Sequence, residues 1–161
     1  MRIILAFMYN LKNCTGTFKG LIGECLFKLT RKNVILPRFF NRNKFISIFD
    51  KYLNEEQRKF ICDNWYSFDA LEVDYSILPR KIIIYEVKTR NYLFAPKSEW
   101  KYKMTYYSSQ LYKQAQKLGF LVRVVSLWLF TNWNFDYKIY EFDPSFYCID
   151  KPKKYDKKRN S

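Results

Sequence analysis

Apolar residues recur at helical spacing in three stretches of the chain. The first stretch opens at Thr15-Gly16-Thr17 and runs to about Thr30, with Leu21, Ile22 and Cys25 on its apolar stripe. The second spans about Glu55 to Asn64 and follows Asn54-Glu-Glu-Gln57, a pattern typical of a capping box. The third spans about Met104 to Leu118 and stops at Gly119, the residue type favoured just after a helix. The sequence therefore predicts three helices.

Strand patterns lie between and after these helices. Phe68 to Leu78 alternates as in a half-buried strand, and Lys81 to Lys88 is a β-branched run typical of a central strand. Pro79-Arg80 between them predicts a tight turn, so the two strands should pair as an antiparallel hairpin. Phe120 to Phe130 is a strongly apolar strand, and Tyr137 to Phe142 is predicted as the last one.

The order of these elements predicts an α/β (α+β) fold, in which helices flank a mixed sheet. Residues 31–49 are basic and aromatic and contain Pro37, so we expect a loop there with one short strand. With the second helix, this stretch forms an insert over about residues 31–66, before the hairpin. We expect one domain over residues 1–150. Residues 151–161 hold five Lys and one Arg and are expected to form a disordered basic tail.

Charge and residue usage narrow the chemistry. The 161 residues include 29 Lys and Arg against 15 Asp and Glu, a net charge of +14 that favours a polyanionic partner such as DNA. The chain has no histidine, and its four cysteines show no Cys-x-x-Cys spacing, so a histidine base and a zinc site are excluded. Carboxylate-held Mg²⁺ or Mn²⁺ beside a lysine remains for phosphodiester chemistry. No apolar run reaches the roughly 20 residues of a spanning helix, so we expect a cytoplasmic protein with no membrane partner.

The predicted hairpin carries the residues suited to that chemistry. Asp74, near the start of one strand, is expected to face Glu86, near the end of the other. Glu86 and Lys88 are two residues apart and therefore share one face of their strand. A metal held by Asp74, Glu86 and the carbonyl of Val87 would lie beside the Lys88 ammonium. Charges at the end of a buried strand are costly, which favours a metal site over an ordinary solvated face.

At these residues the chain resembles the PD-(D/E)XK nuclease superfamily, most closely its archaeal Holliday-junction-resolvase branch. Val73-Asp74-Tyr75 resembles motif II and Glu86-Val87-Lys88-Thr89-Arg90 motif III, while Lys19-Gly20-Leu-Ile-Gly23-Glu24 resembles the first-helix motif that supplies a metal-binding glutamate. Asp69 is the alternative motif II residue. Asp74 is preferred because its separation from Glu86 in the sequence resembles the separation of motifs II and III in the family. About 50 residues separate Glu24 from Asp74, more than in compact resolvases, which favours another branch of the superfamily over junction resolution.

The resemblance implies a restriction-endonuclease-like αβββαβ core and a Mg²⁺- or Mn²⁺-dependent deoxyribonuclease. It would be an endonuclease of DNA recombination or repair, structure-specific if it is resolvase-like, and a homodimer as resolvases are. Glu24, Asp74 and Glu86 would bind the metal, and Lys88 would position water or stabilise the transition state. The alternative is a non-catalytic nucleic-acid-binding protein that retains the core. A third alternative is a structural protein whose charge reflects only codon bias.

Further residues are candidates for supporting roles. Gln110 and Lys113 on the third helix and Glu72 beside Asp74 are candidate accessory groups, each with an exposed surface position as the simpler interpretation. Basic residues around the insert and motif III are expected to contact phosphates, namely Lys19, Arg31, Lys32, Arg38, Arg42, Lys44 and Arg90.

Overall fold

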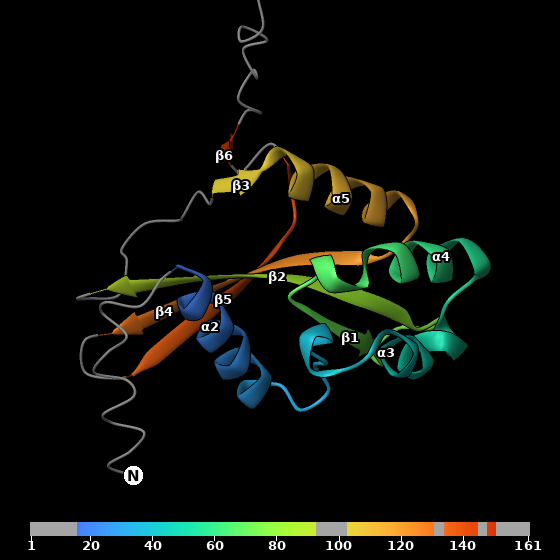
Figure 1. Cartoon of the computed structure of the whole chain (residues 1–161), viewed down its shortest axis with the longest axis horizontal. Helices are drawn as coiled ribbons and strands as arrows, with labels where there is room; N and C mark the ends of the chain where they lie inside the picture. The colour runs from blue at the N-terminus through green and yellow to red at the C-terminus, as the bar shows by residue number, and fades with distance from the viewer. Residues whose placement is uncertain (1–15, 93–102, 131–133, 145–147, 151–161) are drawn as a thin grey trace, which may run out of the picture.

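The computed structural model describes residues 16–92, 103–130, 134–144 and 148–150 and shows a mixed α/β fold (Figure 1). The basic tail at residues 151–161 lies outside the described residues. The described helices are α2 (Gly16–Thr30), α3 (Arg42–Phe49), α4 (Glu55–Asn64) and α5 (Tyr106–Lys117). The described strands are β1 (Ala70–Asp74), β2 (Lys81–Tyr92), β3 (Lys103–Thr105), β4 (Leu121–Phe130), β5 (Phe135–Glu141) and β6 (Cys148–Asp150). Among these helices none is long and apolar enough to cross a membrane.

Four strands form one mixed sheet in the order β1-β2-β4-β5. β1 is antiparallel to β2, β2 is parallel to β4, and β4 is antiparallel to β5. The parallel pair needs a crossover, which α5 provides. α5 packs on one face of the sheet and α2 on the other (Figure 1). The predicted mixed sheet flanked by helices is therefore confirmed, and its central strands are apolar because both of their faces are covered.

The insert between α2 and β1 contains two helices rather than one. α4 begins as predicted, with the Asn54 side chain accepting from the Gln57 N–H and the Gln57 side chain accepting from the Asn54 N–H. α3 lies where we predicted a loop, so that prediction is wrong. Phe45 and Phe49 are one turn apart and both buried; the surrounding basic residues and Pro37 obscured this spacing.

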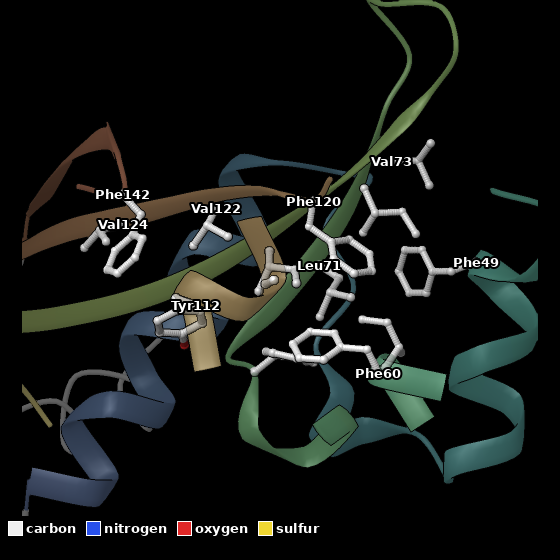
Figure 2. Close-up of a cluster of buried hydrophobic side chains, with 14 of the residues drawn as sticks. Phe49, Phe60, Leu71, Val73, Tyr112, Phe120, Val122, Val124 and Phe142 are labelled. Carbon is white, nitrogen blue, oxygen red and sulfur yellow. The ribbon is translucent and has the colours of Figure 1, made fainter. Parts of the chain in front are cut away.

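The insert packs into the main core rather than lying outside it. Phe49 and Phe60 from the insert meet Leu71 of β1 and Phe120, next to β4, in one buried cluster (Figure 2). The Gln57 side chain also donates to the Leu118 carbonyl at the end of α5, at 2.7 Å. α3 and α4 therefore hold β1 and the carboxyl end of α5 in place.

The hairpin differs from its prediction at the turn. β1 ends at Asp74 instead of Leu78, and residues 75–80 form an exposed loop. The Asp74 carboxylate accepts hydrogen bonds from both the N–H and the hydroxyl of Ser76, at 2.9 and 2.6 Å. This local turn gives the backbone an alternative to the strand ladder. The shorter strand changes which residues face each other across the hairpin.

A third strand ahead of the hairpin is reduced to a single bridge. Between α2 and α5, the described part of the four-stranded sheet contains β1 and β2, whereas the αβββαβ expectation has three strands. Ile35 forms an isolated antiparallel bridge to Leu71, with backbone hydrogen bonds of 2.7 and 2.8 Å in the two directions. Ile35 therefore lies where a third strand would extend the sheet beyond β1.

Candidate functional site

The register of the hairpin places Asp69, and not Asp74, beside Glu86. Asp74 pairs with Lys81 at the turn, and Ala70 pairs with Tyr85, so the next pair outward is Asp69 and Glu86. Asp74 is five residues from that position, roughly 16 Å along the strand. The expectation that Asp74 faces Glu86 is therefore wrong, because Asp74 lies at the end of its strand and not at the start.

Asp69 directly precedes β1, and from this point on the edge of β2 is no longer paired with β1. Its Oδ2 accepts a hydrogen bond from the Val87 N–H at 2.7 Å. Because the N–H and C=O of one strand residue project to the same side, the Val87 carbonyl faces this edge as well. Burial, followed by repulsion from Glu86 and Glu24, raises the pKa of Asp69 to about 8. The side chain is thus held near other carboxylates.

Glu86 is the buried centre of the cluster. Only 6% of the residue is exposed. The Tyr112 hydroxyl of α5 donates to its Oε2, and the Lys88 ammonium pairs with its Oε1. Lys88 keeps about a third of its side chain exposed, so it faces both the carboxylate and solvent. The predicted shared face of Glu86 and Lys88 is confirmed.

Tyr112 is a site residue that sequence reasoning missed. It lies on the buried face of α5 with Ser109 and Ala115, and this spacing is that of an ordinary core tyrosine. Burial and the neighbouring Glu86 raise its pKa well above the usual value, so the phenol stays protonated and donates. Gln110 is exposed and Lys113 partly exposed, and neither belongs to that buried face.

Glu24 of α2 lies near Glu86 and Asp69, and its role in a metal site stays a prediction. A Cβ added at Gly23 would lie 1.7 Å from the Thr89 Oγ1, so only glycine allows α2 to approach β2 this closely. Glu24 is 3% exposed, and its Oε1 accepts from the Arg38 guanidinium at 2.7 Å. Its Oε2 is buried with no hydrogen-bond partner among the described residues. Burial, with repulsion from Glu86 added and Arg38 opposing, raises the pKa of Glu24 to about 7.

The three carboxylates lie close enough to repel one another. Glu86 raises the pKa of both Asp69 and Glu24, and Glu24 raises that of Asp69. Such oxygen-only donors suit Mg²⁺ or Mn²⁺, and a divalent cation would relieve both the repulsion and the unpaired Glu24 oxygen. In the arrangement seen here, no three Asp, Glu or Cys side chains of the described residues converge tightly enough to hold a metal. Arg38 and Lys88 instead supply the positive charge.

Glu72 does not support this cluster. It pairs with Ile83, which places it on the face of the sheet opposite to Glu86. There it accepts from the Tyr85 hydroxyl at 2.7 Å and forms an ion pair with Arg31 at 2.9 Å. The expectation that Glu72 is an outer ligand is therefore wrong, because residues of odd and even register lie on opposite faces.

The predicted phosphate-binding residues do not lie together. Arg38 lies at the carboxylate cluster, whereas Arg31 is engaged with Glu72 on the other face. The remaining residues are exposed or partly exposed, and their role stays a prediction; they are Lys19, Lys32, Arg42, Lys44 and Arg90.

Comparison of the chain with protein-family models, with curated proteins and with solved structures finds no match. The sequence and the geometry of the site therefore carry the functional argument.

Proposed function

We propose that this protein is a Mg²⁺- or Mn²⁺-dependent DNA endonuclease with a core of the PD-(D/E)XK type. The observation that carries the proposal is the proximity of Glu24, Asp69 and Glu86, which come from three separate segments, together with the ion pair between Glu86 and Lys88. Placing the buried Glu24 and Glu86 near the partly buried Asp69 is costly, and a bound divalent cation would offset that cost. In this proposal Asp69 replaces Asp74 as the motif II residue.

Each residue would have a separate task. Glu24, Asp69 and Glu86, with the Val87 carbonyl, would hold the cation, which when bound lowers the pKa of water and neutralises charge on the phosphate. Lys88 would position the attacking water or stabilise negative charge as it develops. Tyr112 would keep Glu86 oriented through its hydroxyl. Arg38 would exchange its ion pair with Glu24 for one with a substrate phosphate. A guanidinium group can donate two parallel hydrogen bonds to a phosphate.

The net charge of +14 supports a nucleic acid as substrate, because the released counterions favour binding. We expect DNA as the substrate and the cytoplasm as the location. Homodimerisation follows only from the resolvase resemblance and is tested by the molecular mass in solution.

Cleavage assays test the assignment. The full chain is incubated with supercoiled, single-stranded and branched DNA in Mg²⁺, Mn²⁺ or EDTA. We expect Asp69→Asn and Glu86→Gln to lose more activity than the about 10–100-fold typical of losing an outer-shell partner, while both still bind DNA in Ca²⁺. Asp74→Asn is the matched control and should cleave normally. Full activity of Asp69→Asn together with loss in Asp74→Asn would overturn the revised assignment.

A non-catalytic nucleic-acid-binding protein is the second candidate. The ion pairs Arg38–Glu24 and Lys88–Glu86 favour it, because cations of the chain itself already neutralise two of the three carboxylates. This candidate predicts DNA binding but no metal-dependent product from any of the substrates above. A metal-dependent product that disappears in Glu86→Gln would exclude it.

A further inference from the structure

The β1–β2 hairpin ends, at the side away from the carboxylates, in an exposed apolar loop. All residues from 75 to 81 are exposed, and Leu78 and Tyr75 keep 87% and 53% of their surfaces open. In Figure 2 the ribbon of the hairpin continues past Val73 into a loop that stands clear of the labelled core side chains. Large apolar side chains gathered on a projecting loop are typical of an interaction site.

Two tyrosines and two cations are arranged together at this loop. The rings of Tyr75 and Tyr52 meet edge to face at 6.2 Å, and their hydroxyls are 3.3 Å apart. The Arg80 guanidinium lies 4.8 Å from the Tyr75 ring centre, and the Lys51 ammonium 4.9 Å from that of Tyr52. Tyr52 and Lys51 belong to the insert, in the short helix Asp50–Tyr52. The insert therefore supports the loop from the side. We call Lys51, Tyr52, Tyr75, Leu78 and Arg80 the hairpin tip.

The cations of the hairpin tip are not neutralised by nearby acids. The Asp74 carboxylate accepts hydrogen bonds from Ser76 and forms no ion pair with Lys51 or Arg80. Asp50, next to Lys51, forms its ion pair with Arg58 at 2.9 Å. Within the described residues, neither Lys51 nor Arg80 forms an ion pair. The hairpin tip therefore combines exposed aromatic surface with two cations that form no ion pair among the described residues.

We propose that the hairpin tip binds unpaired bases of a nucleic acid, with a base stacked on Tyr75 and the adjoining phosphates held by Lys51 and Arg80. Aromatic rings interleaved with cations match the alternation of base and phosphate along a single strand. Inside a duplex the base faces are already stacked, so a narrow loop reaches them only at strand ends, gaps or branches. The hairpin tip thus selects nucleic acid with unpaired segments.

The two ends of one hairpin would then act on one strand. The hairpin tip and Asp69 are separated by the length of β1, roughly 16 Å at about 3.3 Å per residue. A strand whose unpaired base rests on Tyr75 has its backbone within a few nucleotides of the carboxylate cluster. This link rests on the proposed function, but binding by the hairpin tip does not.

Binding in EDTA separates the two proposals. Fluorescence anisotropy is measured for the full chain with a duplex carrying a single-stranded tail and with the matching blunt duplex. Because stacking on one aromatic ring changes affinity by about 5- to 150-fold, Tyr75→Ala should weaken binding to the tailed duplex at least about five-fold. Its affinity for the blunt duplex should stay unchanged. Tyr75→Phe keeps the ring and should bind the tailed duplex like the wild type.

Two further variants test whether the affinity depends on Tyr75 itself, on any exposed tyrosine, or on positive charge. Tyr107→Ala removes a tyrosine that is 78% exposed on α5 and should leave the preference for the tailed duplex intact. Arg80→Gln should reduce the dependence of affinity on salt by about one phosphate contact. Circular dichroism confirms that each variant is folded.

Three results would overturn the proposal. The first is equal affinity of Tyr75→Ala and wild type for the tailed duplex, and the second is an equal loss in Tyr107→Ala. The third is Tyr75-dependent binding to anionic phosphatidylserine vesicles without any preference for the tailed duplex, which would make the loop a membrane contact. Failure of the protein to cleave DNA would leave this binding result untouched.

Discussion

Replacing Asp69 by Asn should stabilise the protein at alkaline pH in EDTA, although it should abolish cleavage. The pKa of Asp69 is raised from 3.8 to about 8, first by burial and then by Glu86 and Glu24. Between these two values the unfolded chain has lost the proton while the folded chain retains it. The free energy of unfolding therefore falls as the pH rises from about 4 to about 8, and the loss is complete above pH 8.

The size of this effect follows from the pKa difference. One pKa unit corresponds to about 1.4 kcal/mol, so the change from 3.8 to about 8 sets an upper bound on the order of 6 kcal/mol. Asn keeps the shape of Asp69 and a carbonyl oxygen for the Val87 N–H, but it carries no charge. We expect Asp69→Asn to be more stable than the wild type by a few kcal/mol at about pH 8.5, with the difference shrinking steadily toward pH 4.

Urea denaturation followed by circular dichroism measures this difference at several pH values in EDTA. Asp74→Asn is the control, because hydrogen bonds from Ser76 lower the pKa of Asp74. Asp74 is therefore ionised throughout the window from pH 5 to 8, and its replacement should not change the slope there. Mg²⁺ at about 100 times its dissociation constant should raise the stability of the wild type by about 2.7 kcal/mol. It should raise that of Asp69→Asn by less.

The reasoning fails if Asp69→Asn shows the same fall in stability with pH as the wild type. It also fails if Asp74→Asn removes the fall in stability with pH, because the carboxylate with the raised pKa would then lie at the other end of β1. If Asp69→Asn is more stable than the wild type but Mg²⁺ stabilises both equally, the repulsion between the carboxylates is supported and the metal site is refuted.

Two further predictions concern the supports of the site, and urea denaturation tests both. Gly23→Ala should destabilise the protein by about 1–3 kcal/mol, because the new Cβ would lie 1.7 Å from the Thr89 Oγ1. Gly20→Ala, with nothing within 4 Å of its Cβ, should instead stabilise α2 by about 0.5–1 kcal/mol, and similar results for both glycines would contradict the close approach of α2 to β2. Tyr112→Phe should cost about 1–3 kcal/mol, because Glu86 loses a buried donor; an unchanged unfolding midpoint would show that this contact contributes nothing.

Local patterns predicted the helices and strands that frame the site. The capping residues of α4, the helical spacing of α5 up to Gly119 and the β-branched run of β2 each depend on neighbours within a few residues. For the same reason, Glu86 and Lys88 could be assigned to one face of their strand from their spacing alone. The absence of histidine likewise removes imidazole donors by composition alone.

Two kinds of feature were not predicted in this way. The choice between Asp69 and Asp74 depends on where the turn begins, and β1 ends four residues earlier than its alternation indicated, at the local turn in which Ser76 donates to Asp74. The other kind is decided by contacts between distant segments. Arg38 and Tyr112 meet the cluster across 14 and 26 residues. Sequence spacing does not show which face of a distant helix or loop will pack against these carboxylates.

The sequence by itself thus predicted α2, α4, α5 and the four strands of the main sheet, with shifted ends, because these follow from residue types and short-range periodicity. Only the tertiary structure decided which carboxylates meet, because a hairpin's register is set by its turn and its packing against the insert and α2. A strand that stops a few residues early places a different acid opposite Glu86.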